Sequence, residues 1–259
     1  MPRSIVARSL EPLVAILWGL FLAWSVWVAV VWIAGIGPAW LGLIEGQAPP
    51  PNEDFRQAVL LLAENADVAW LALAVMNLHL VITDAHGLRT ARAWLGFTGG
   101  GAFLLGLLNE RLGVPFGWMA FGGTLGMRLA GVAVGWLLLW AVLVMSAREA
   151  VLWVRRRASH ALVAALTAFA VFFTMVNIEM PARFVRGWWV WHGGEVRTPA
   201  PMPWWGWVAW FVWPWLTAYA MREKSVVSGV AGRSPRPMVI LLLLNAIPLA
   251  ARLRIWIQG

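Results

Sequence analysis

Residues 13–36 read LVAILWGLFLAWSVWVAVVWIAGI and contain no charged side chain. An apolar run of about 20 residues has the length that a helix needs to cross a hydrocarbon core of about 30 Å. This run is too long for the core of a signal peptide, and no small-residue cleavage motif follows it. We therefore interpret it as a retained membrane span.

Further apolar runs along the chain predict that the first span is one of several. Of the 259 residues, 61% are hydrophobic and 12% are charged, about half the charged share of a soluble domain. No soluble domain fits between the runs, so we expect residues 1–259 to form a single transmembrane domain. The predicted fold is all-α, a polytopic membrane helix bundle with about seven transmembrane helices, the others at residues 66–83, 93–109, 129–147, 160–181, 204–221 and 238–256.

The formal charge of +8 fits a membrane protein and does not indicate nucleic-acid binding. Arg residues retained in cytoplasmic loops already make such proteins basic. The 20 Lys and Arg residues divide 12 to 8 between the two sets of alternate loops, which favours a cytoplasmic N-terminus. We expect an integral protein of a prokaryotic-type inner membrane. The chain has no Cys, which excludes disulfides and thiolate metal sites.

Three segments differ from simple spans, and the alternation of spans places all of them on one side of the membrane. Residues 37–56 contain a triple Pro and predict an outer loop with polyproline character. Residues 110–128 are apolar but short and rich in Gly, so they predict a re-entrant or interfacial segment. Residues 182–203 predict a long outer loop rich in Trp and Pro.

Ionisable residues near a span are functional candidates, because burying them in a membrane costs on the order of 3 kcal/mol. Asp84 and His86 fall at the other end of the second span. The carboxylates on the side of the three unusual segments are Glu64, Asp67, Glu110 and Glu179. This shared side makes the carboxylates the better candidate site.

Simpler roles exist for each of these side chains. Glu110 precedes Arg111, and Glu179 lies four residues before Arg183, so either carboxylate could form an ion pair at the membrane interface. His79 lies inside a span and suits an interhelical hydrogen bond better than a cofactor ligand. No metal-ligand motif is present, and the four His residues are scattered, so we predict neither a metal nor a cofactor.

The 21 Trp residues are mostly explained by aromatic belts at the two membrane interfaces. Trp24, Trp27 and Trp32 lie near predicted span ends and fit such belts. Belts do not explain Trp188, Trp189 and Trp191, which are concentrated in one short segment. We therefore assign these three indoles to a ligand.

Short motifs in a fixed order give the sequence a family resemblance. They are His79, Gly87, Arg89, Arg92, Glu110, Gly113, Pro115-Phe116-Gly117, Leu125-Gly126, Gly131-Val132 and Trp140, then Pro181, Trp189-Val190-Trp191, Gly193-Gly194, Pro201 and Gly206-Trp207. Over about residues 70–210 the chain resembles the integral-membrane carotenoid biosynthesis family. That family includes hydratases that add water to a terminal double bond of acyclic or monocyclic carotenoids.

The resemblance implies acid-catalysed hydration, which needs a proton donor, a stabilised tertiary cation and a positioned water. An apolar pocket favours the protonated form of a carboxyl group, so a buried Glu can donate the proton. We expect Glu110 to be the acid and Glu179 or Asp67 to position water. We expect the substrate to contact His79, Phe116, Trp188, Trp189 and Trp191.

The chain departs from the family pattern at polar positions near the end of the fifth span. Val176 and Met180 stand where the family usually has Asp, with Asn177 and Glu179 nearby. These departures favour an alternative, a non-catalytic carotenoid-binding or structural subunit of a larger membrane complex. A transporter is a third hypothesis, but the sequence shows no inverted halves. Expected partners are a carotenoid or other polyene lipid, membrane lipids and other subunits of a membrane complex.

Overall fold

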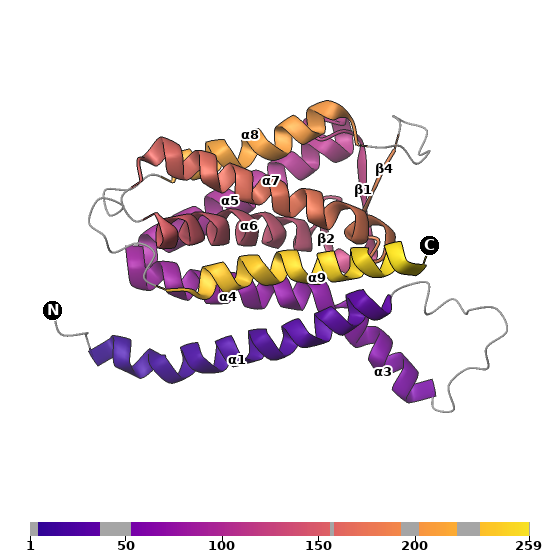
Figure 1. Cartoon of the computed structure of the whole chain (residues 1–259), viewed down its shortest axis with the longest axis horizontal. Coiled ribbons are helices and arrows are strands. Elements are labelled where there is room, and N and C mark those ends of the chain that lie inside the picture. The colour runs from indigo at the N-terminus through magenta and orange to yellow at the C-terminus, as the bar shows by residue number, and fades with distance from the viewer. Residues whose placement is uncertain (1–4, 37–52, 156–157, 193–201, 222–233, 259) are drawn as a thin grey trace.

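The computed structural model describes residues 5–36, 53–155, 158–192, 202–221 and 234–258. Within these ranges the long helices lie side by side as a bundle (Figure 1). This architecture confirms the predicted all-α membrane helix bundle. Its helices are α1 (Ile5–Ala34), α3 (Glu53–Glu64), α4 (Ala66–His86), α5 (Leu88–Leu112), α6 (Val134–Val154), α7 (His160–Phe184), α8 (Trp204–Ala220) and α9 (Arg236–Gln258).

Six helices of the described chain are long and apolar enough to cross a membrane: α1, α4, α5, α6, α7 and α9. The predicted span at residues 204–221 also forms a helix, α8, but it has only 17 residues. At 1.5 Å per residue, α8 is about 25 Å long, less than the ~30 Å hydrocarbon core. The structure therefore supports six spans of full length and one shorter apolar helix.

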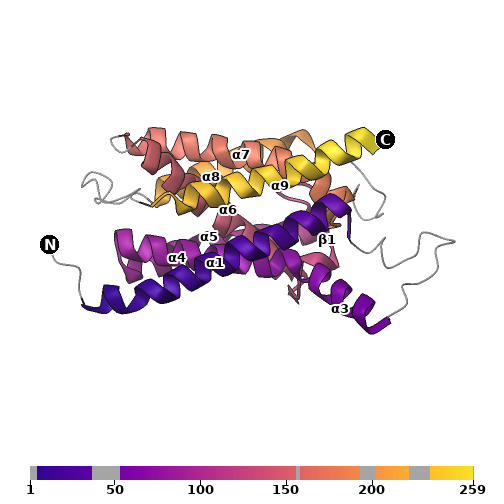
Figure 2. The same cartoon turned by 60° about the horizontal axis from the view of Figure 1, so that its bottom comes forward.

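Helix α6 forms the centre of the bundle and packs against α4, α5, α7 and α9. Every side chain from Leu139 to Ala150 is buried, including Arg148 and Glu149. A helix that is buried all round belongs to the core and not to the lipid-facing surface. Helix α1 packs on α4 and α9 along the outside of the bundle (Figure 2).

Short strands close one end of the bundle between the helices. Strand β1 (Met119–Phe121) pairs antiparallel with β4 (Trp189–Trp191), with Ala120 opposite Val190. Strands β2 (Arg128–Leu129) and β3 (Val132–Ala133) form a second pair. Alternate residues of a strand point to opposite faces, and accordingly Trp189 and Trp191 are buried while Val190 is 41% exposed. Pairing with β1 thus turns both indoles of β4 toward the interior.

The three unusual segments contain more regular structure than the sequence indicates. Residues 53–56, predicted as loop, begin α3, and residues 37–52 of that segment lie outside the described residues. In the segment 110–128, α5 continues to Leu112 and ends at Gly113, whose left-handed φ of +65° suits glycine. The rest of that segment supplies β1 and the short 3-10 helix η1 (Gly123–Leu125).

The Trp-rich segment 182–203 is also not a simple loop. Helix α7 continues to Phe184, and the three Trp residues lie at β4 because backbone pairing with β1 organises them. Residues 193–201 lie outside the described residues. The predicted span 129–147 is shifted to α6 (Val134–Val154), since β2 and β3 occupy its first residues.

Candidate functional site

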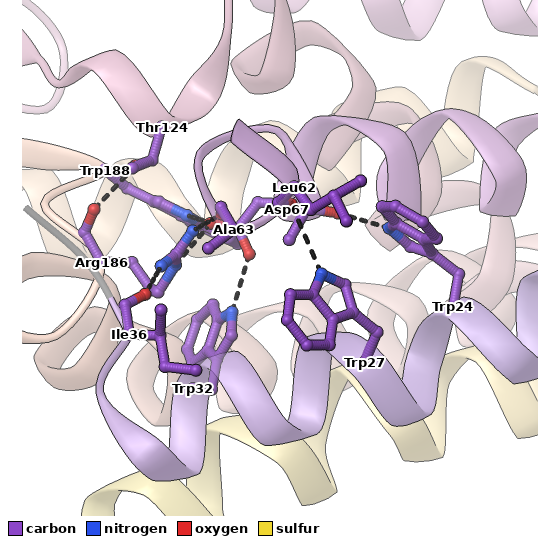
Figure 3. A network of polar contacts seen from close by, with 11 residues as sticks. Trp24, Trp27, Trp32, Ile36, Leu62, Ala63, Asp67, Thr124, Arg186 and Trp188 are labelled. Atoms are coloured by element: carbon purple, nitrogen blue, oxygen red, sulfur yellow. Dashed lines mark hydrogen bonds and ion pairs between the residues drawn. The ribbon is translucent and has the colours of Figure 1, made fainter. Parts of the chain in front are cut away.

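Asp67 lies at the centre of a buried polar network at the end of the bundle that carries the strands (Figure 3). Its Oδ2 accepts hydrogen bonds from Arg186 Nε at 2.8 Å and from Trp188 Nε1 at 2.7 Å. Its Oδ1 accepts a third from Trp32 Nε1 at 2.7 Å. The side chains of Asp67 and Arg186 are both 0% exposed. The network therefore joins α1, α4 and the segment after α7.

The guanidinium of Arg186 uses each of its nitrogens in a different contact. Besides the bond from Nε to Asp67, Nη1 donates to Ile36 O and Nη2 donates to Ala63 O, both at 2.6 Å. The main chain is held as well, because Thr124 Oγ1 donates to Arg186 O at 2.7 Å. Buried charges are tolerated when they are paired and hydrogen-bonded, and here every nitrogen of the guanidinium has an acceptor.

Helix α1 is attached to the site by indole groups that the sequence assigns to an aromatic belt. Trp24 Nε1 donates to Ala66 O at 2.8 Å, and Trp27 Nε1 donates to Leu62 O at 3.4 Å (Figure 3). Trp32, which donates to Asp67, is fully buried. These Trp residues therefore make specific interhelical contacts, in addition to any role at the membrane interface.

Glu179, in the last turns of α7, is held by two indoles of β4. Trp189 Nε1 donates to Oε2 at 2.8 Å, and Trp191 Nε1 donates to Oε1 at 2.7 Å. The guanidinium of Arg183, four residues on, lies 5.0 Å from the centre of the Phe184 ring. Two neutral indole donors thus orient the carboxylate, and the guanidinium of Arg183 acts on it only through its charge.

Aromatic rings connect the two carboxylates to Phe116. The rings of Trp188 and Trp189 are 5.7 Å apart, and Trp189 meets Trp136 edge to face at the same distance. Phe116 packs against Trp136 at 5.9 Å and is 0% exposed. Its backbone N–H donates to Asn109 Oδ1 at 2.9 Å, so α5 fixes its position. Six of the predicted site residues therefore lie in one connected cluster: Asp67, Phe116, Glu179, Trp188, Trp189 and Trp191.

Glu110 follows Asn109 at the end of α5 and lies against the turn between β2 and β3. A Cβ placed on Gly131 would come within 1.8 Å of Glu110 Oε2, so the carboxyl group touches the backbone of this turn. Oε2 is buried and has no hydrogen-bond partner among the described residues. Glu110 thus differs from Asp67 and Glu179, whose oxygens all accept hydrogen bonds.

His79 and His86 lie away from this cluster. His79 lies 12 residues beyond Asp67 on α4, which is about 18 Å along a helix, and its buried Nδ1 has no hydrogen-bond partner among the described residues. His86 contacts Glu149 at the opposite end of the bundle. In the described part of the chain, no group of three or more His, Asp and Glu side chains could hold a metal ion.

The structure reveals important residues that the sequence reasoning did not select. In the sequence Arg186 is one of the 20 loop charges with nothing to distinguish it, and in the structure it is the partner of Asp67 across 119 residues. At the opposite end, Arg148 Nη1 donates to Glu149 Oε1 at 2.6 Å, and the guanidinium lies 4.2 Å from the Trp94 ring centre. In the sequence, the adjacent Arg148 and Glu149 at the end of a long apolar run are the pattern that could have predicted this second cluster.

Replacement of Gly131 by Ala is expected to lower the free energy of unfolding by about 1–3 kcal/mol. The residue has φ +94°, which is strained for Ala, and the new methyl group would displace the carboxyl group of Glu110. Thermal unfolding in a mild detergent measures the change. Gly123→Ala is the control, because its Cβ would meet no atom within 4 Å. Equal stability of the two variants would contradict the described position of Glu110.

Replacement of Trp191 by Phe removes the donor to Glu179 Oε1 and keeps an aromatic ring in the core. Hydrogen bonds to charged groups are worth about 1.5–3 kcal/mol, so we expect a loss of stability in this range. The matched control is Trp205→Phe, since that side chain is 49% exposed and should change stability by less than about 0.5 kcal/mol. A loss no greater than that of the control would show that the indole bond to Glu179 is unimportant.

Fold and site together define the class of this protein, a polytopic helical membrane protein with a buried cluster of carboxylates and indoles at one end. Comparisons with family models, curated proteins and solved structures found no match.

Proposed function

We propose that this chain is a membrane-embedded hydratase that adds water to a terminal carbon–carbon double bond of an acyclic or monocyclic carotenoid. The observation that carries the proposal is the buried Oε2 of Glu110, which has no hydrogen-bond partner among the described residues. Buried polar atoms are nearly always hydrogen-bonded, so an exception calls for an explanation, and a reactive group is one. The motifs of residues 70–210 support the choice of substrate class.

In this proposal Glu110 is the general acid. Its proton passes to the less substituted carbon of the terminal double bond, and the electron pair of that bond forms the new carbon–hydrogen bond. A tertiary cation remains on the neighbouring carbon. Because Oε2 makes no hydrogen bond within the described protein, a proton on it is free to meet a substrate.

Glu179 positions the water that traps the cation. Each of its oxygens accepts one indole hydrogen bond, and a carboxylate has about four acceptor sites, so both oxygens can still bind water. The water oxygen bonds to the cationic carbon, and one of its protons passes to Glu179. Transfer of this proton to Glu110 through solvent restores the starting state, so the overall reaction consumes only water.

Asp67 takes no part in the chemistry of this proposal. It is 0% exposed, and donors from Arg186, Trp32 and Trp188 occupy its oxygens. The indoles of β4 are also buried, so we assign them to holding the carboxylate of Glu179. The negative charge of Glu179, oriented by these indoles, supplies the electrostatic stabilisation of the cation.

A second candidate function is a non-catalytic, carotenoid-binding or structural subunit of a larger membrane complex. It is favoured by the complete burial of Trp188, Trp189 and Asp67, which makes this end of the bundle a rigid support. Under this function Glu110 would accept a hydrogen bond from a ligand or a partner subunit and would not transfer a proton.

The proposed setting is the inner membrane of a prokaryotic-type cell, with the N-terminus in the cytoplasm. The 12 to 8 division of Lys and Arg between alternate loops supports this orientation. A polyene substrate would reach the protein from the lipid. Hydration changes no overall oxidation state, so the proposed reaction requires no redox cofactor.

Expression in a host that accumulates an acyclic carotenoid tests the proposal. Chromatography and mass spectrometry of the extracted pigments should reveal a monohydroxylated or dihydroxylated product that is missing when Glu110 is replaced by Gln. A purified protein that carries unmodified pigment in a one-to-one ratio, with no hydroxylated product, would overturn the hydratase and support the binding subunit.

A further inference from the structure

We infer that Arg186 and Asp67 form a positioning pair that sets the orientation of Glu179 through Trp188 and strand β4. The inference deepens the proposed function and rests on the role of Glu179 in it. The two residues form an ion pair inside the protein, and among the described residues no hydrogen bond or ion pair joins either of them to Glu179. They are therefore positioning residues and not catalytic ones.

The connection from the pair to Glu179 begins at Trp188. Its indole N–H donates to the same Asp67 oxygen that accepts from Arg186 Nε. Its main chain is fixed on both sides, since Trp188 N donates to Ala182 O and Gly122 N donates to Trp188 O, each at 2.8 Å. Trp188 is thus held by α4, by α7 and by the segment after β1.

The connection ends at the two indoles that hold Glu179. Trp189 follows Trp188 directly, and Trp191 stands on the same face of β4. A rotation of Trp188 would move the start of β4 and so turn the N–H groups of Trp189 and Trp191 away from the carboxylate. Fixing Trp188 therefore fixes the direction in which Glu179 faces a water molecule.

The contacts of Arg186 explain why an ion pair is used here. Its planar guanidinium reaches Asp67, Ile36 O and Ala63 O at once, which the single ammonium group of Lys cannot reproduce with the same geometry. A buried ion pair often contributes little net stability compared with apolar residues of similar size. The pair instead fixes the relative positions of the segments that contain Ile36, Ala63 and Asp67, and of the Trp188 indole bound to Asp67.

The first test is kinetic and uses the purified full-length chain with an acyclic carotenoid. Arg186→Lys is expected to lower kcat by about tenfold, the effect of about 1.4 kcal/mol, while KM changes by less than about twofold. In a protein that already carries Glu179→Gln, Arg186→Lys should have almost no further effect, because the pair acts only through Glu179. If the double variant loses kcat by the product of the two single-variant factors, the two residues act independently and the inference is overturned.

The second test needs no activity and measures hydrogen exchange of the indole N–H groups by NMR. Signals of Trp189 and Trp191 are assigned by their disappearance in the Trp189→Phe and Trp191→Phe variants. In Arg186→Lys these two hydrogens should exchange about tenfold faster or more, because their bonds to Glu179 are loosened. The hydrogen of Trp136, which donates to Ala102 O at 3.1 Å, should keep its rate and so shows that the bundle is intact.

The two tests separate this inference from the proposed function. Faster exchange at Trp189 and Trp191 in a protein that hydrates no carotenoid would support the positioning pair and reject the hydratase. Hydration of the carotenoid together with unchanged indole exchange in Arg186→Lys would support the hydratase and reject the positioning pair. If the Arg186→Lys variant does not fold, Trp188→Phe is used in its place. This substitution breaks the connection to β4 and leaves the ion pair of Arg186 and Asp67 intact. Unchanged exchange at Trp189 and Trp191 in Trp188→Phe would overturn the inference.

Discussion

Replacement of Asp67 by Ala is expected to lower the free energy of unfolding by about 3–5 kcal/mol. The change removes the partner of a guanidinium that is 0% exposed, and it also leaves the indole N–H groups of Trp32 and Trp188 without an acceptor. Unfolding in detergent, followed by the loss of α-helical circular dichroism, measures the change. We expect this to be the largest stability effect of any single substitution considered for this chain.

Asp84→Ala is the matched control for this experiment. Asp84 lies on the same helix, α4, but is exposed, so its replacement should change stability by less than about 0.5 kcal/mol. A similar, small effect of both substitutions would contradict the account of Asp67 as the centre of the network. In that case the contacts of Arg186 with Ile36 O and Ala63 O would be enough to hold the three segments together.

Glu110→Gln is expected to lower the rate of carotenoid hydration by about 10²–10⁴-fold, the usual contribution of a general acid. Gln is nearly the same size as Glu and keeps the contact with Gly131, so the fold should be maintained. The measurement is product formation at saturating substrate, which reports kcat and not binding. A variant that retains the full rate would remove Glu110 from the proposed role.

Glu64→Gln provides the control for general effects of charge loss. Glu64 ends α3 at the same end of the bundle but is exposed, so the hydration rate should stay within about twofold of the original. If both substitutions abolish hydration equally, the loss reflects the negative charge of this end of the protein. The loss of activity in Glu110→Gln would then not show that Glu110 donates the proton.

Apolar runs predict the helices of this chain well because helix length is set by the membrane. The run at 66–83 corresponds to α4 (Ala66–His86), and the run at 160–181 corresponds to α7 (His160–Phe184). The sequence pattern misplaces the end of a helix where charged residues are buried within the bundle. Helix α6 continues through Arg148 and Glu149 because each neutralises the other, while the sequence pattern places a membrane boundary there.

The alternation of spans predicts that the carboxylates Asp67 and Glu179 lie near the same end of the bundle, and the structure brings both into one cluster there. The individual partners could not be predicted. Asp67 meets Arg186 across 119 residues and Trp32 across 35, and no local periodicity encodes such pairs. The pairing of β1 with β4, which turns Trp189 and Trp191 toward Glu179, likewise depends on the packed bundle.

Hydration of an acyclic carotenoid in water enriched with the heavy isotope ¹⁸O tests the central claim most directly. The purified chain is placed in lipid vesicles with the polyene, and the pigment is analysed by mass spectrometry. We expect a hydroxylated product that carries the heavy oxygen, formed by the native chain and not by Glu110→Gln. Recovery of the polyene unchanged, or of a hydroxyl oxygen that does not come from water, would contradict it.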